Sequence, residues 1–358
     1  MGTPPPASNK TKPSLLRAAG VIVAAAALSA LMTPEPGERE RASRVDRGRM
    51  AASPWQISWQ GWKDILWRTY REFQDDRLLA ISAGVVFFAL LALFPAVTAI
   101  VSLYGLFAEP VKISEHIGII NSFAPDQLVS IVEEQIKRLV ARDNAQLGFG
   151  VLLGIAIALW SANAGMKSLM DALNVVYEER EKRGFFKLNL ISLVFTFCAV
   201  AAVLFAIGAV VVVPLALDRI GIGAVSERLI EFGRWPVLVV TILFGLSLLY
   251  RYGPSRMKAK WRWLSVGSLV ATLLWIAGSA ALSYYIRHYA NYDATYGSLG
   301  TGIGLMMWLW VSTSAILFGG ELNAEIEHQT AADTTRGPDK PMGARGATMA
   351  DTVGRSYP

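Results

Sequence analysis

The sequence predicts an all-α membrane protein, a polytopic helix bundle with six core transmembrane helices and additional interfacial amphipathic helices. Three observations predict this class. Hydrophobic residues make up 53% of the 358 residues, and the mean hydropathy is +0.38. Only 17% of the residues are charged, below the roughly 25% that is usual in soluble proteins. Finally, the chain contains repeated apolar stretches that approach the roughly 20 residues needed to cross a bilayer.

Six stretches are long and apolar enough to be core spans. We expect each to be a helix, because backbone polar groups find no water inside the hydrocarbon region. The fourth stretch is short, but Trp235, Tyr250 and Tyr252 flank it as aromatic residues flank a span at the membrane interface. The six predicted spans cover residues 80–107, 147–166, 188–217, 235–250, 264–286 and 299–320.

The distribution of Lys and Arg predicts the orientation of the bundle. The second and fourth connections between spans carry five Lys or Arg each, whereas the third carries three and the fifth only Arg287. The first connection is long and carries four. Cytoplasmic loops are enriched in these residues. We therefore predict that both ends of the six-span core, and the second and fourth connections, face the cytoplasm.

Two segments have the pattern of amphipathic helices. In residues 59–73, Trp59, Trp62, Leu66 and Phe73 share one helical face, and Arg68 is among the charged residues placed elsewhere. This pattern predicts a helix on the cytoplasmic interface. Residues 125–140 form a second apolar stripe in the first connection, which is interpreted either as a helix packed on the outer end of the bundle or as a lid over a cavity.

The two ends of the chain differ in composition from the middle. Residues 1–53 are predicted to be a disordered extension, and residues 329–358 a disordered cytoplasmic tail. Between them, residues 54–328 form the predicted transmembrane domain. Within the extension, the Ala-rich segment 15–32 is of marginal length. It is compatible with a seventh span, an interfacial helix, a signal peptide or a start-site artefact.

Several classes of site are not expected. The single cysteine, Cys198, excludes an internal disulfide, and it is predicted to be a small buried hydrophobe. The three histidines show no ligand spacing, and there is no P-loop or nucleotide-binding glycine motif at a strand–helix junction. We therefore expect no catalytic residues, no metal, no cofactor and no nucleic acid. The net charge of +6 comes from residues in the loops.

Four regions resemble the YihY/BrkB family of bacterial inner-membrane proteins, in the order that the family has them. They are "AISAGVVFFALLALFPA" (80–96), "FGVLLGIAIALWSANAGMKSLMDALNVVYEEREKRGFFK" (149–187), "LYRYGPSRMKAKWRWLSVGSLVATLLW" (249–275), and residues 291–323 with Asn291, Tyr292, Thr295, Tyr296 and Gly297 before Gly320, Glu321, Leu322 and Asn323. The resemblance covers roughly residues 60–328.

The resemblance implies the fold and the location of the protein, and it implies little about chemistry. The family is also called virulence factor BrkB and was formerly labelled ribonuclease BN, a label regarded as misassigned. What it implies is an envelope-associated protein of the inner membrane, with transport of lipid or solute as the associated activity.

Candidate substrate-path or gating residues lie in or beside three of the predicted spans. Pro95 lies in mid-span and predicts either a hinge or a static kink. Asn163 precedes a Lys167–Asp171 pair at helical spacing, which predicts either a salt-bridged helix end or a polar path residue. Near the last span, the candidates are Tyr296, Gly297, Gly300 and Gly304; the last two have the small-xxx-small spacing of close helix packing.

The end of the last span carries three further candidates, Glu321, Asn323 and Glu325. Glu321 lies about 33 Å along the helix from residue 299, at the cytoplasmic boundary of the membrane. An acid at a helix C-terminus opposes the helix dipole. One interpretation is a helix end among the headgroups. Such an acid needs a reason, for example pairing with Arg or Lys of the second or fourth connection. The sharper hypothesis is that Glu321 pairs inside the bundle, holding the cytoplasmic mouth shut or binding a coupling proton.

The sequence leaves three functions open. The first is a transporter or flippase-like protein for lipid or an anionic solute that supports the cell envelope. The second is an envelope-integrity scaffold that transports nothing. The third, an enzyme such as the old ribonuclease label names, lacks the clustered ligands that a metal-dependent nuclease needs. The expected partners are membrane lipids, with self-association into a homo-oligomer left open.

Overall fold

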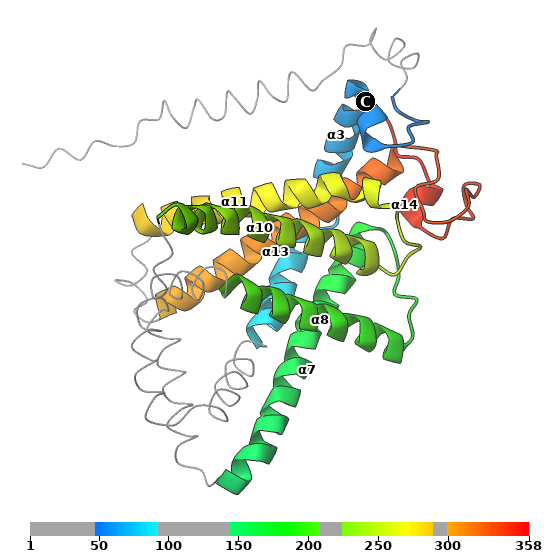
Figure 1. The fold of residues 1–358 in the computed structure, drawn as a ribbon. Helices are drawn as coiled ribbons and strands as arrows, with labels where there is room; N and C mark the ends of the chain where they lie inside the picture. The colour runs from blue at the N-terminus through cyan, green and yellow to red at the C-terminus, as the bar shows by residue number, and fades with distance from the viewer. Residues whose placement is uncertain (1–46, 92–143, 208–223, 289–298, 358) are drawn as a thin grey trace, which may run out of the picture.

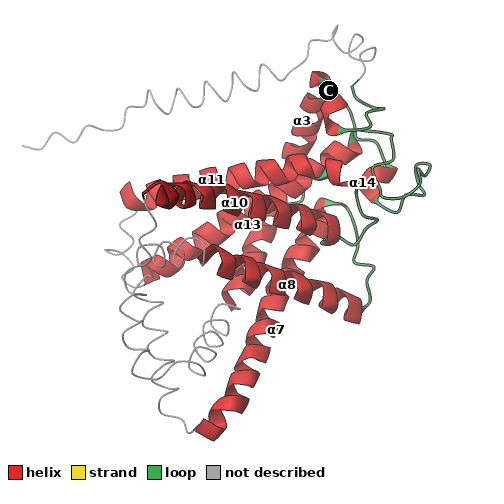
Figure 2. Cartoon of the chain, viewed as in Figure 1, coloured by secondary structure: helices red, strands yellow, loops and turns green. Residues whose placement is uncertain are grey.

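The computed structural model describes residues 47–91, 144–207, 224–288 and 299–357, and within them the chain is helical (Figures 1 and 2). One isolated bridge, between Ala259 and Thr335, is the only strand-like pairing in these residues. The helices are η1 (Pro54–Gln56), α3 (Trp59–Asp75), an apolar helix at Leu78–Leu91, α7 (Asn144–Val176), α8 (Phe185–Ile207), α10 (Ala224–Tyr252), η3 (Trp261–Trp263), α11 (Ser265–His288), α13 (Leu299–His328) and α14 (Thr348–Asp351).

Four candidate membrane spans occur among the described residues, and they match the third to sixth predicted spans. They are Phe185–Ala202, Trp235–Tyr252, Trp261–Ile286 and Gly302–His328. The first predicted span is described only at its beginning, as the shorter apolar helix Leu78–Leu91. The second lies within α7, which is not among these four. The all-helical fold is confirmed, and the number of six spans stays a prediction.

The spans expose most of their apolar surface, as expected for helices that face lipid. Within the four windows only 11% to 28% of residues are buried inside the protein. On α8, Phe197 and Val200 are exposed, and so is Cys198. The prediction that Cys198 is a buried hydrophobe is therefore wrong, because α8 turns this face outward.

Helices α11 and α13 pack closely because glycine lets their backbones approach. A Cβ atom on Gly267 of α11 would lie 2.1 Å from the carbonyl oxygen of Gly319 on α13. The side chain of Asn323 secures this crossing. Its Oδ1 accepts from the Gly267 N–H (2.8 Å), and its amide donates to the Leu264 carbonyl (3.2 Å). Small residues at such crossings are the usual means of close helix packing in membranes.

The buried core lies at one end of the bundle, which we call the α14 end: the last turns of α7, α10 and α13 together with α14. Figure 1 shows these helix ends, the starts of α8 and α11, and the C-terminus gathered on the same side of the molecule. The core there contains Met170, Leu173, Val176, Tyr177, Tyr250, Leu264, Leu317 and Met349. The second and fourth connections, which carry five Lys or Arg each, are thus attached to a packed layer.

Helix α3 packs against α13 with a face that the sequence did not predict. It begins at Trp59 after Ser58, whose hydroxyl accepts from the Gly61 N–H. Trp59 and Leu66 are exposed, as expected for an interfacial face. However, Arg68, which the pattern placed outside the apolar face, is 4% exposed and turned toward α13.

The C-terminal segment, residues 329–357, is packed and hydrogen-bonded, in contrast to the predicted disordered tail. Thr330, Thr334 and Met349 are buried. Arg345 holds the segment together by donating to the carbonyls of Ala331 (2.7 Å) and Ala350 (2.6 Å). Residues 47–53, predicted to belong to the disordered extension, are packed as well. The prediction failed because composition does not reveal that a polar segment can satisfy buried arginines with its backbone carbonyls.

Candidate functional site

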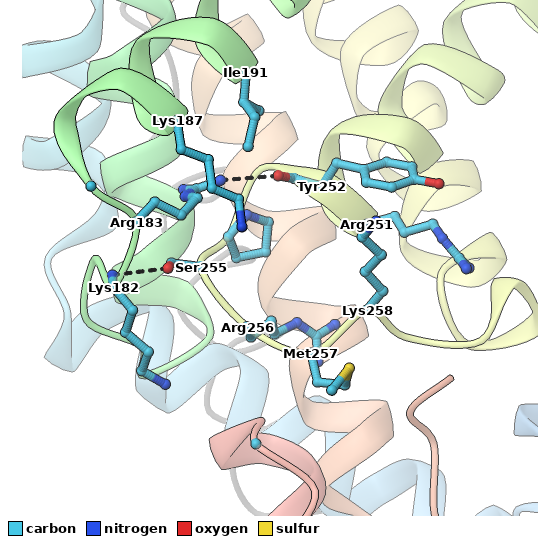
Figure 3. A pocket seen from close by; sticks show the side chains of 13 residues that line it. Lys182, Arg183, Lys187, Ile191, Arg251, Tyr252, Ser255, Arg256, Met257 and Lys258 are labelled. Atoms are coloured by element: carbon cyan, nitrogen blue, oxygen red, sulfur yellow. Dashed lines mark hydrogen bonds between the residues drawn. The ribbon is translucent and has the colours of Figure 1, made fainter. Parts of the chain in front are cut away.

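A strongly basic cavity of about 530 Å³ lies at the α14 end, between the start of α8 and the loop from α10 to α11 (Figure 3). Among the residues that the structure describes, no carboxylate lines it. Gly184, just before α8, and Lys187 and Ile191 of α8 form part of the wall. Six cationic side chains line it: Lys182, Arg183, Lys187, Arg251, Arg256 and Lys258.

Asn174, near the end of α7, joins the two loops that form the cavity. Its Oδ1 accepts from the backbone N–H of Ser255 (2.7 Å), and its amide donates to Glu181 (3.1 Å). In return, the backbone N–H of Lys182 donates to the Ser255 hydroxyl (2.9 Å), and Arg183 donates to the Tyr252 carbonyl (3.2 Å); Figure 3 marks both bonds. The basic side chains are therefore held on fixed backbone.

Three of the cations are neutralised by carboxylates behind the cavity wall. Lys182 lies 2.6 Å from Glu179, and Arg183 lies 2.6 Å from Glu181. Partial burial works against ionisation of Glu181, but the hydrogen bonds from Arg183 prevail and lower its pKa to about 2. Arg256 makes two bonds to Glu327, at 2.6 and 2.9 Å, and also lies 4.1 Å from the Tyr177 ring centre.

The other three cations have no carboxylate partner within the described part of the chain. Lys258 lies 4.6 Å from the Tyr252 ring centre, and Lys187 is exposed. Arg251 is 5% exposed; it donates to the Ala259 carbonyl (2.5 Å) and stacks over Trp261, while its Nε has no hydrogen-bond partner. Because a buried cation without a counter-charge is costly, this excess positive charge favours an anion in the cavity.

The three glutamates at the end of α13 differ in their partners. Glu325 receives a hydrogen bond from Arg68 of α3, and Glu327 is paired with Arg256 of the fourth connection. Glu321 is fully buried, and neither of its oxygens has a hydrogen-bond partner in the described part of the chain. The expected pairing of Glu321 with a basic connection is thus wrong. The glutamate that pairs with the fourth connection is Glu327, which lies further along the same helix.

The structure places the other predicted site residues away from the cavity. Asn323 is used in packing, as described above. Asn163 is buried on α7 and donates to Asn189 of α8 (3.3 Å). Lys167 turns to the same Asn189 oxygen (3.0 Å), instead of forming the predicted bridge to Asp171. Gly300 is buried, and Gly304 approaches Ile286. Pro95, Tyr296 and Gly297 lie outside the described residues, as do segments 15–32 and 125–140.

Sequence reasoning missed the two cations that complete the buried pairs, Arg68 and Arg256. One signal could have found Arg68: it follows Asp64 by four residues, and the helix buries both on the face opposite its exposed aromatic residues. Asp64 in turn accepts from Arg47 (2.7 Å) and from the Tyr357 backbone N–H (2.8 Å). No local pattern marks Arg256 as different from the other basic residues of its loop.

Two half-buried acids at the end of α3 give a testable pH dependence. Burial raises the pKa of Glu72 and of Asp76 above their ordinary values of 4.5 and 3.8, and nearby carboxylates add to the shift. Their protonated forms therefore stabilise the fold at acid pH, and this stabilisation is lost as the pH rises through the raised values. We expect the Glu72→Gln/Asp76→Asn variant to lack this loss.

The measurement is the melting temperature of both proteins in detergent over a series of pH values. The melting temperature of the wild type should fall progressively below that of the variant as the pH rises from acid to neutral. A constant difference at all pH values would show that these two acids titrate normally.

The sequence matches the protein family described as Virulence factor BrkB over residues 69–343, more than half of the chain. The chain belongs to the BrkB family. A relative with the name "Putative ribonuclease-like protein YfkH", from Bacillus subtilis (strain 168), is 34% identical over 247 residues, which cover 68% of this chain and 88% of YfkH. A UPF0761 membrane protein of Actinobacillus pleuropneumoniae serotype 5b (strain L20) is 25% identical over 253 residues, 69% of this chain and 88% of that protein.

The family comparison confirms the resemblance found in the sequence and identifies the chain as a membrane protein of the BrkB family. No solved structure is significantly similar to it. The family match begins within α3 and extends to residue 343, beyond the predicted end of the transmembrane domain at residue 328. It therefore includes both sides of the basic cavity, the three glutamates of α13 and part of the packed C-terminal segment.

Proposed function

We propose that this BrkB-family protein is a transporter or flippase-like protein of the bacterial inner membrane that moves an anionic lipid or an anionic solute. The observation that supports the proposal is the basic cavity, which has six cations in its lining and no carboxylate among the described residues there. The Lys and Arg content of the loops at the α14 end supports a cytoplasmic location for the cavity.

The position of the cavity favours a molecule with an anionic head and an apolar body. At its α8 side, Phe185, Phe186 and Leu190 are exposed at the start of a candidate span, and Phe244 and Trp261 are stacked and exposed on the α10 side. An anionic headgroup held by Lys187, Arg251 and Lys258 would thus have apolar helix surface beside it for its chains. A small anionic solute would use the cations alone.

The test is transport by the purified protein in liposomes. We expect flux of a fluorescent anionic phospholipid, or of a trapped inorganic anion, above that of protein-free vesicles. A zwitterionic lipid should move more slowly. Binding of the anion without any flux would contradict transport and would favour the alternative, an envelope-integrity scaffold.

Removing the two unpaired lysines should weaken anion binding without affecting the fold. A charge-assisted hydrogen bond contributes about 1.5–3 kcal/mol, so the Lys187→Gln/Lys258→Gln variant should bind an anionic lipid at least about tenfold more weakly. The matched control is Lys63→Gln/Arg262→Gln, which removes the same charge from exposed residues outside the cavity lining. An equal loss in both variants would show that only the overall charge matters.

A further inference from the structure

Glu321 is chemically different from the two other acids at the end of α13. Glu325 and Glu327 are as deeply buried, but each is paired with an arginine. The side chain of Glu321 lies inside the packed α14 end, and neither Oε1 nor Oε2 has a hydrogen-bond donor from the part of the chain that is described. The mechanism suggested by the basic cavity does not use this residue.

The surroundings of Glu321 contain acids and phenols but no cation left for it among the described residues. The carboxylates of Glu72, Asp76, Glu178 and Glu325 all act on it electrostatically. Of the arginines nearby, Arg68 is bound to Glu325 and Arg256 to Glu327. The acids that act on Glu321 thus come from three elements: Glu72 and Asp76 from the end of α3, Glu178 from just beyond α7, and Glu325 from α13. The buried phenol of Tyr177 also interacts with it electrostatically.

A carboxylate in such a place is strongly disfavoured. Removing an ionised carboxylate from water costs many kcal/mol unless it is paired, and the usual result is that the group takes up a proton. Four like-charged neighbours add to this cost. We infer that Glu321 is a proton-binding site, and that its carboxyl group carries a proton while α3, α7 and α13 are packed together as in this structure.

Two of the acids that act on Glu321 are less buried than it is. Glu72 and Asp76 are only half-buried, and burial together with neighbouring carboxylates raises their pKa values above the ordinary ones. This inference does not depend on the anionic cavity; a role in driving transport would rest on the proposed function.

Infrared spectroscopy of the purified protein in lipid tests the proton directly. A protonated carboxyl group absorbs at a C=O stretching frequency distinct from that of a carboxylate or an amide. We expect this band at neutral pH in the wild type, its loss in Glu321→Gln, and its retention in the control Glu178→Gln, which changes an exposed acid in the same region. A wild-type band that Glu321→Gln leaves unchanged, or the absence of any band, would overturn the inference.

A second measurement needs no variant and therefore stands even if Glu321→Gln fails to fold. An apolar carbodiimide reacts with a protonated carboxyl group, and its adduct is located by peptide mass spectrometry. Labelling should occur at Glu321 and decrease at alkaline pH, whereas Glu325 and Glu327 on the same helix serve as buried, ion-paired controls. Labelling of all three alike, or of the two controls without Glu321, would contradict a proton held specifically at Glu321.

Discussion

Replacing Arg68 by alanine is expected to destabilise the protein by about 3–5 kcal/mol, the cost of breaking a buried ion pair from one side. The Arg68 and Glu325 side chains are 5% and 1% exposed. Arg68 also donates to the Gln329 side chain (2.8 Å) and to the Arg355 carbonyl (2.7 Å). Its removal leaves Glu325 charged and buried, and frees the C-terminal segment from α3. The free energy of unfolding in detergent is the quantity to measure.

The same helix supplies the control for this prediction. Arg71 is paired with Asp75 at 3.3 Å, but both side chains are more than half exposed. Exposed pairs contribute about 0–1 kcal/mol, so Arg71→Ala should change stability little. The stability of Arg68→Lys should fall between the two, because lysine keeps the charge but lacks the planar fork that reaches acceptors on Glu325, Gln329 and Arg355. Equal stability of Arg68→Ala and Arg71→Ala would show that the buried pair contributes nothing.

The helices could be predicted because their causes are local. A long uncharged stretch in hydrocarbon has to be helical, so the segments around Val240, Leu273 and Leu309 were correctly assigned. The grouping of the second and fourth connections at one end also followed from simple alternation of spans. This grouping also indicated a basic surface at that end. Four of the cations that line the cavity come from those two connections: Lys182, Arg183, Arg256 and Lys258.

The pairing of individual charges could not be predicted, because it depends on rotation and approach of whole helices. Glu321, Glu325 and Glu327 lie within two turns, and nothing in their spacing tells which of them meets Arg68 and which meets Arg256. Composition misled for the same reason at the C-terminus. A segment rich in Gly, Thr and Ala is ordered here because Arg68 and Arg345 use its backbone carbonyls.

Replacing Gly267 by alanine is the second change expected to have a large effect. The new Cβ atom would lie 2.1 Å from the Gly319 carbonyl oxygen and 2.4 Å from Cγ of Asn323, closer than atoms can approach. One of these contacts is backbone, so α11 has to move away from α13. Overpacking of this kind typically costs about 1–3 kcal/mol, and the shift also weakens the hydrogen bond from the Gly267 N–H to Asn323.

The control for the glycine prediction separates crowding from helix propensity. Outside its own helix backbone, a Cβ atom on Gly302 of α13 would meet none of the described atoms within 4 Å, so no described neighbour obstructs Gly302→Ala. Alanine is favoured over glycine in a helix by about 0.8–1.0 kcal/mol; Gly302→Ala should therefore be neutral or stabilising. Gly319→Ala, whose Cβ would lie 2.5 Å from the Gly267 carbonyl oxygen, should reproduce the loss seen in Gly267→Ala. Equal melting temperatures for Gly267→Ala, Gly319→Ala and Gly302→Ala would contradict the close approach of α11 and α13. They would also show that the Asn323 hydrogen bonds do not hold this crossing together.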